Sequence, residues 1–181
     1  MTKAVANNST GRGVPWRMIG WGTAALLMLL PLMAMHYTDE VKWTASDFLF
    51  MGVLLGGIGL AFEFMVRKSA SLAYRLAAAS ALLATFLTIW VNAAVGMIGS
   101  AGNPLNLMFA GVLIIALSGA ILARLNPAGM ARAMLAAAIA QAVAGAVGLS
   151  TDPRGALLSM GFAVLWLPAA ALFRKAASAR V

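Results

Sequence analysis

Four of the polar side chains inside the long apolar segments of this 181-residue chain are the first candidates for binding chemistry. Thr85, Thr88 and Asn92 are spaced i, i+3, i+7 and therefore share one face of a helix. Such a face either lines a path for a small neutral solute or hydrogen-bonds to a neighbouring helix. Gln141 stands in a run of Ala and Gly, and we expect it to hydrogen-bond across a helix bundle to Asn92 or a threonine. A contact to a substrate is the alternative.

Glu63 is the only acid within an apolar segment, and Arg67 follows it four residues later. On a helix this spacing places the two charges on one face, where they can pair. Glu63 is then either an interfacial ion-pair partner of Arg67 or a carboxylate that binds a proton or a cation. The first interpretation fits its shallow depth, about 6 Å from the end of the segment.

His36 is the single histidine, and it lies beside Tyr37, Asp39 and Glu40. It is either an interfacial side chain or a weak metal candidate that shares an ion with the acids. The chain has no cysteine, which excludes disulfides and thiolate ligands. No Gly-rich phosphate loop, Ser-His-Asp set or pair of catalytic carboxylates appears. We therefore expect no catalytic residues, no cofactor and no enzymatic activity.

The composition of the chain indicates the surroundings in which these residues lie. Hydrophobic residues make up 62% of the chain and charged residues 10%, and the mean hydropathy is +0.91. Soluble domains carry about 25% charged residues, and a domain of this size cannot bury so much apolar surface. A net charge of +8 would suggest nucleic acid in a soluble protein. In a chain this apolar it indicates membrane topology instead, so we expect the lipid bilayer, and not nucleic acid, as a partner.

The hydropathy predicts an all-α fold, an integral membrane bundle of six transmembrane helices. Each segment has about the 17 to 25 residues that cross the hydrocarbon of a bilayer. Residues 16–175 are expected to form one transmembrane domain, between a flexible cytoplasmic tail at 1–15 and a short tail at 176–181. The six predicted helices are Met18–Met35, Phe48–Val66, Leu72–Met97, Leu107–Ala123, Ala133–Leu149 and Ala156–Phe173.

The basic residues predict the orientation of this bundle. With six spans, eleven Lys and Arg fall on one side of the membrane, and only Lys42 and Arg154 fall on the other. Positive charge is retained on the cytoplasmic side, so both termini are expected there. The eleven are Lys3, Arg12, Arg17, Arg67, Lys68, Arg75, Arg124, Arg132, Arg174, Lys175 and Arg180.

Part of the chain resembles a family of small, uncharacterised polytopic inner-membrane proteins of proteobacteria. The resemblance covers roughly Asp47–Leu149. It implies a multi-pass location in the bacterial inner (cytoplasmic) membrane and no assigned activity. The family carries an acidic pair before Asn-Pro, where this chain has Ala101-Gly102, so no cation-binding residues carry over. The resembling stretches are Leu87–Ser100, Asn103–Met108, Ala123-Arg124 and Gly129–Ala133.

These observations leave two functions open. The first is a non-enzymatic structural or accessory subunit, which packs through small-residue helix faces against a second copy of itself or within a larger membrane complex. Gly52, Gly56, Gly57 and Ala61 supply such a face. The alternative is a small-solute channel or facilitator, a minimal transporter that uses the polar stripe of the third helix together with Gln141.

Overall fold

The computed structural model describes residues 16–179. The predicted all-α fold is confirmed: in this part of the chain, six helical segments are long and apolar enough to cross a membrane. The chain divides after Gly59 into two compact units, and each is described by itself. The tail predicted at residues 1–15 lies outside the described residues. The single transmembrane domain expected over residues 16–175 stays a prediction.

The first unit holds α1 (Trp16–Tyr37) and most of α2 (Ala45–Val66). The ring of Trp21 covers Gly59, and a Cβ added there would lie 3.2 Å from its Cη2. The predicted second helix began at Phe48, whereas α2 begins at Ala45. The earlier start follows from Thr44, whose N–H donates to Asp47 Oδ2 at 2.7 Å and whose hydroxyl donates to the same oxygen at 2.8 Å.

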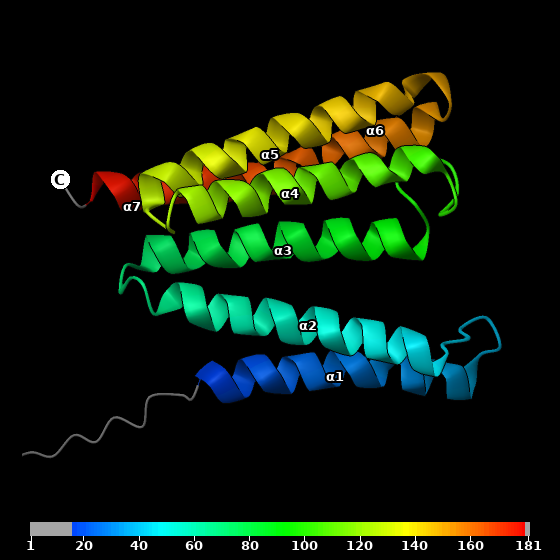
Figure 1. Cartoon of the computed structure of the whole chain (residues 1–181). Helices are drawn as coiled ribbons and strands as arrows, with labels where there is room; N and C mark the ends of the chain where they lie inside the picture. The colour runs from blue at the N-terminus through cyan, green and yellow to red at the C-terminus, as the bar shows by residue number, and fades with distance from the viewer. Residues whose placement is uncertain (1–15, 180–181) are drawn as a thin grey trace, which may run out of the picture. The chain divides into compact units, whose positions relative to one another are not determined.

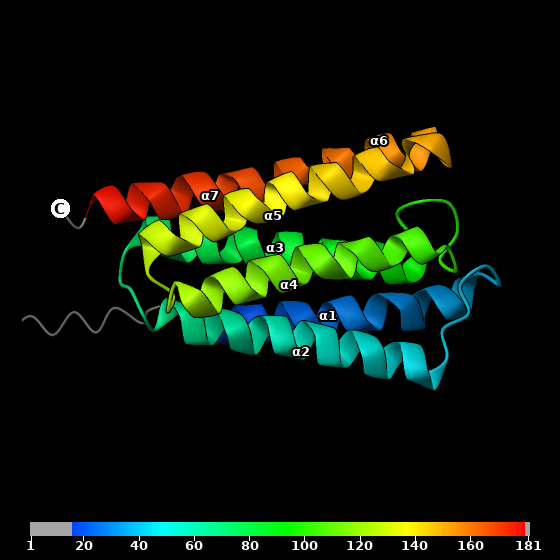
Figure 2. The same ribbon diagram turned by 45° about the horizontal axis from the view of Figure 1, so that its top comes forward.

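The second unit is a helical bundle built around α5. Helix α5 packs against α4, α6 and α7, and α3 packs against α7 and α4 (Figures 1 and 2). The bounds are α3 Leu72–Ala94, α4 Leu107–Leu122, α5 Pro127–Val147, α6 Pro153–Gly161 and α7 Ala163–Ser178, with short 3₁₀ turns η1 Pro104–Asn106 and η2 Gly148–Ser150.

Small side chains explain the central place of α5. Its buried face is mostly Ala and Gly, and 44% of its apolar window is buried, more than in any other described span. Backbones can approach closely where no large side chain intervenes. At Gly119 on α4, an added Cβ would overlap the Cβ of Ala133 on α5. Large side chains fill the remaining core; Tyr74 and Phe173, both fully buried, meet edge to face at 5.2 Å.

The predicted bounds of three further segments were wrong. Helix α3 ends at Ala94 and not at Met97, because Gly96 adopts φ +78° and stops the helix. Helix α5 begins at Pro127 and not at Ala133, because Asn126 Oδ1 accepts the N–H of Ala128. The sixth span runs from Pro153 to Ser178, beyond the predicted Ala156–Phe173, and is interrupted between α6 and α7.

The close approach of α5 to α6 yields a prediction about Gly145. An added Cβ there would lie 2.7 Å from the backbone N of Met160 and 3.0 Å from the carbonyl oxygen of Ala156. Because backbone atoms cannot rotate away, Gly145→Ala is expected to lower the stability of the bundle by about 1–3 kcal/mol. Thermal unfolding in detergent measures this.

Gly111→Ala is the matched control, because an added Cβ on this α4 glycine meets nothing within 4 Å. It should leave stability unchanged or raise it by up to about 1 kcal/mol. Equal effects of the two substitutions would contradict the packing argument.

Candidate functional site

A cluster of buried polar side chains lies where α3 ends, and its centre is Asn106, a residue that the sequence pattern did not single out. Asn106 is buried on η1. Its Oδ1 accepts the N–H groups of Met97 at 3.0 Å and Ile98 at 2.9 Å. Its Nδ2 donates to the carbonyls of Ile98 at 3.3 Å and Ser100 at 2.8 Å. One amide thereby satisfies four backbone groups of the loop between α3 and α4.

Glycine makes this approach sterically feasible. Gly96 has φ +78°, and an added Cβ would lie 2.7 Å from both Asn106 Nδ2 and the carbonyl oxygen of Ser100. A larger residue would be strained at this φ and would also displace the amide. Gly96 therefore both ends α3 and leaves room for the Asn106 side chain.

The same loop is tied to α5 and α6 by a second group of buried hydrogen bonds. Ser159 Oγ on α6 donates to the carbonyl of Met97 at 2.8 Å. Gln141 Nε2 on α5 donates to the carbonyl of Ser159 at 3.2 Å and lies 3.7 Å from Met97 Sδ. Gln141 is fully buried and Ser159 is 2% exposed. Three elements distant in sequence are thus joined through Met97.

Asp152 adds a third tie at the edge of this cluster. Its Oδ1 accepts the N–H of Gly155 at 3.0 Å, which caps α6, and its Oδ2 accepts the N–H of Gly99 at 2.8 Å. These hydrogen bonds, Gly155 first and Gly99 second, hold the pKa of the Asp152 carboxyl below its ordinary value. The residue links the start of α6 to the loop after α3.

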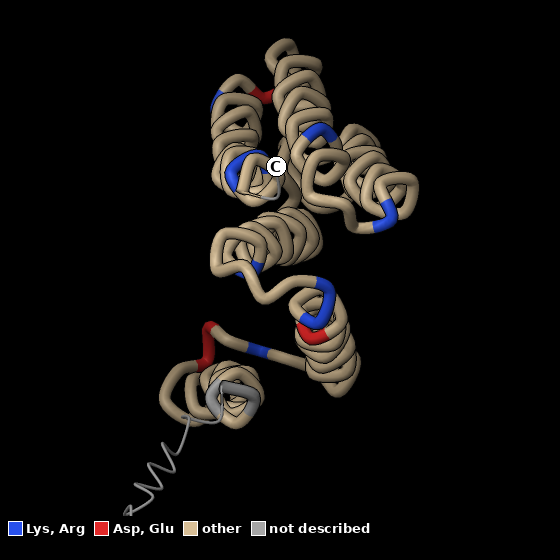
Figure 3. The backbone as a smooth tube through the Cα atoms, turned by 90° about the vertical axis from the view of Figure 1, so that its left-hand side faces the viewer, with Lys and Arg blue, Asp and Glu red and all other residues tan. Residues whose placement is uncertain are grey.

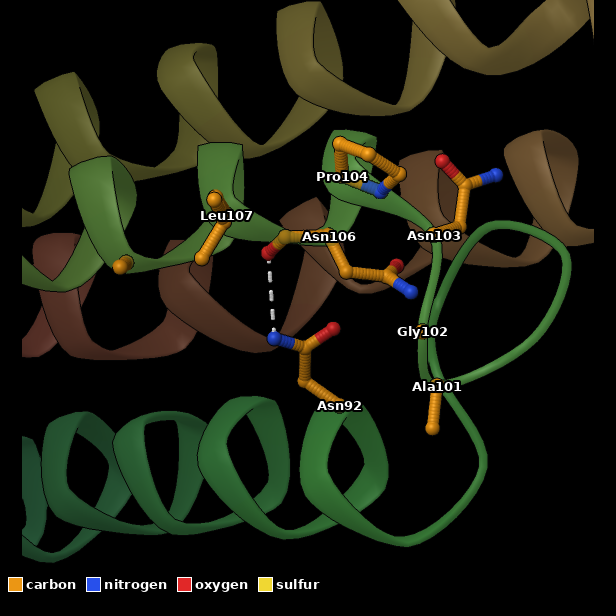
Figure 4. A pocket seen from close by; sticks show the side chains of 8 residues that line it. Asn92, Ala101, Gly102, Asn103, Pro104, Asn106 and Leu107 are labelled. Atoms are coloured by element: carbon orange, nitrogen blue, oxygen red, sulfur yellow. Dashed lines mark hydrogen bonds between the residues drawn. The ribbon is translucent and has the colours of Figure 1, made fainter.

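A pocket of about 360 Å³ opens beside the loop. Asn92 lines it from α3, and its side chain points toward Asn106, with Nδ2 donating to the Asn106 carbonyl at 3.1 Å (Figure 4). The Oδ1 atom of Asn92 is buried and has no hydrogen-bond partner. The other lining residues are Ala101, Gly102, Asn103, Pro104, Asn106, Leu107 and Ala110.

The structure therefore brings only part of the predicted cluster together. Asn92 and Gln141 both contact the Met97–Asn106 loop, but neither is the partner of the other. Thr85 donates to the carbonyl of Ala81 on its own helix at 2.9 Å. Thr88 is fully buried, and its hydroxyl has no partner. The expected bond from Gln141 to Asn92 or a threonine was wrong, because a backbone carbonyl and a thioether occupy the donor.

The other two predicted sites lie apart from this loop in the sequence. Arg67 Nη2 and Glu63 Oε2 are 3.5 Å apart, with the Arg67 side chain 71% exposed and that of Glu63 17% exposed. This is the predicted i, i+4 ion pair. His36 is exposed at the end of α1 and meets the ring of Tyr37 at 5.3 Å. Among residues 16–179, no group of three or more His, Asp or Glu could hold a metal ion.

A recognisable signal existed for some of the residues that the sequence reasoning missed. Asn106 follows Asn103-Pro104, an N-cap and first-turn pair, and is the second polar side chain within one turn of the helix start. Ser159 and Trp166 had no such signal. Trp166 is fully buried on α7, and its Nε1 has no partner, although buried indoles usually find one.

The fold and these contacts fit one class of protein, a multi-pass α-helical membrane protein in which the buried Asn106, Gln141 and Ser159 side chains gather where α3 ends. Comparison of the chain with protein-family models, with curated proteins and with solved structures finds no match.

Loss of the Asn106 amide should be the most damaging polar substitution in the bundle. Asn106→Ala leaves the buried N–H groups of Met97 and Ile98 without acceptors, and we expect a loss of about 2–4 kcal/mol. Asn92→Ala removes one hydrogen bond and should cost about 1 kcal/mol. Denaturation in detergent of both variants checks the order, and a larger loss for Asn92→Ala would contradict the central role of Asn106.

The stability of the loop should depend on pH through Asp152. Because its folded-state pKa is lowered, the ionised carboxylate stabilises the fold above about pH 3.8, the ordinary value of the aspartate carboxyl. This contribution disappears as the pH falls through the folded pKa. Asp152→Asn should lower the melting temperature at neutral pH and reduce its further fall below about pH 4.

The exposed Asp39 provides the control. Asp39→Asn should leave the melting temperature and its acid dependence close to those of the unsubstituted protein. An acid dependence that Asp152→Asn leaves unchanged would show that Asp152 does not carry the effect.

Proposed function

We propose that this chain is a non-enzymatic structural or accessory subunit of the bacterial inner membrane, with both termini in the cytoplasm. Two observations from the sequence support the location: the one-sided distribution of Lys and Arg and the resemblance to small inner-membrane proteins of proteobacteria. The role itself is supported by how the described polar side chains are used.

The observation that carries the proposal is the buried network around Met97 and Asn106. Its hydrogen bonds join Asn106, Ser159 and Gln141 to backbone groups of their own bundle. A transport path or catalytic site needs polar groups that face a solute. Here the buried amides and hydroxyls with known partners hydrogen-bond to the backbone of neighbouring segments and so stabilise the bundle.

The helix faces of the first unit offer surfaces for packing against a partner. None of the apolar window of α1 is buried. Gly20 and Gly22 on α1, and Gly56 and Gly57 on α2, have no atom within 4 Å of an added Cβ. In a membrane, such small residues allow the backbone of another helix to approach closely. This supports assembly with a second copy or with a larger complex.

One observation favours the alternative of a small-solute facilitator. Asn92 borders the pocket at the end of α3 with a buried acceptor that has no partner in the chain. A solute with an N–H or O–H donor would complement that oxygen. Thr85, Thr88 and Gln141, the other members of the predicted path, are not among the pocket's lining residues.

Native mass spectrometry and native gels of the full chain, extracted in a mild detergent, test the assembly. We expect a complex of fixed stoichiometry, either with a second copy or with another membrane protein. Gly56→Leu combined with Gly57→Leu should release the monomer, because leucine side chains block close helix approach. Gly111→Leu, at an equally open glycine of α4, should leave the complex intact.

A purely monomeric chain would contradict the proposal. The facilitator would replace it if proteoliposomes carrying the protein passed a small neutral solute and Asn92→Ala abolished that flux without loss of stability. Neither result depends on the orientation of the termini.

A further inference from the structure

One end of the second unit is strongly basic. The start of α3, the turn between α4 and α5, and the end of α7 all lie at this end (Figures 1 and 2). Figure 3 looks toward this end, with the basic residues in blue. We call the following residues the basic end: Arg67, Lys68, Arg75, Arg124, Arg132, Arg174 and Lys175.

Few of these charges are neutralised within the described chain. Glu63 is the one acid among the described residues at this end, and it pairs with Arg67. Lys68 lies 5.1 Å from the ring centre of Phe64, and Arg75 Nε donates to the carbonyl of Ser69 at 3.3 Å. Arg124 and Arg132 are exposed and form no salt bridge with a described acid. These two guanidinium groups are available to an anion.

The turn that carries Arg124 is held in an unusual backbone conformation. Arg124 and Leu125 have φ of +47° and +60°, a region that costs about 1–2 kcal/mol per non-glycine residue. The fully buried Tyr74 hydroxyl donates to the carbonyl of Leu125 at 3.1 Å, and the Asn126 side chain caps α5. These contacts fix the turn and hold Arg124 at the surface.

Below these charges, both helices expose apolar stripes. On α5, Arg132 is followed at i+3, i+7 and i+11 by Leu135, Ile139 and Val143, so the four share one face. On α4, Ile114, Leu117 and Ile121 form a similar stripe that ends beside the turn. All six apolar side chains are between 48% and 65% exposed. Basic side chains at the end of two helices, followed along each helix by exposed apolar side chains, complement the charged headgroup and the acyl chains of an anionic phospholipid.

We propose that the turn between α4 and α5 binds an anionic phospholipid. Arg124 and Arg132 bind the phosphate headgroup, and the acyl chains lie along the stripes of α4 and α5. Guanidinium groups suit phosphate because they donate two parallel hydrogen bonds. The apolar stripes favour a lipid over free phosphate, because a lipid contacts both the stripes and the two charges, whereas a soluble anion contacts the charges alone.

Native mass spectrometry of the full chain in detergent tests this with phosphatidylglycerol and phosphatidylcholine of identical acyl chains. Phosphatidylglycerol should bind preferentially, and added salt should weaken its binding. Arg124→Gln combined with Arg132→Gln should weaken phosphatidylglycerol binding about twenty-fivefold, because each lost charge accounts for about fivefold. Phosphatidylcholine binding should not change.

Two matched variants distinguish a site from a general charge effect. Arg154→Gln removes an exposed charge at the start of α6, the opposite end of this bundle, and should leave binding unchanged. Arg124→Lys combined with Arg132→Lys keeps both charges and should retain most of the binding. Equal binding of the two lipids, or an equal loss in Arg154→Gln, would overturn the proposal. Displacement of the lipid by millimolar inorganic phosphate would also overturn it, by indicating a simple anion site.

Discussion

The structure depends on one constraint: a backbone polar group in an apolar surrounding must find its partner within the chain. Helices meet this requirement along their length, but the loop after α3 cannot. Asn106 solves the problem with a single side chain, since its amide offers two donors and an acceptor to the backbone of Met97, Ile98 and Ser100. The positions of Gly96 and Ser159 follow from that bonding pattern.

Close packing of small residues supplies the rest of the architecture. A lipid surrounding gives apolar helices little reason to associate, so contact depends on how closely their backbones approach. Gly119, Gly145 and Gly148 each bring a neighbouring element within the space that a Cβ would occupy. The Ala-rich α5 can therefore hold Gln141 fully buried beside Ser159 and Met97, where its donor is satisfied.

The sequence predicted the helical class and the number of spans because hydropathy is a property of composition and length. Local capping set several boundaries: the Asn126 side chain caps α5, which begins at Pro127 and not at the predicted Ala133. The Glu63–Arg67 pair was predictable from helical spacing alone. The partners of Gln141 were not, because they are a backbone carbonyl and a thioether that only tertiary packing brings within reach.

The polar side chains at the two ends of the second unit have different surroundings. At one end, neutral amides, a serine and Asp152 bond to loop backbone, so their polarity is directed inward. At the other end, exposed guanidinium groups have one described acid among them, so their charge is directed outward. Charge retained at a membrane surface fixes orientation through the potential of the bilayer, whereas satisfied amides fix geometry. The bundle thus separates the hydrogen bonds that hold it together, at one end, from the charges that face outward, at the other.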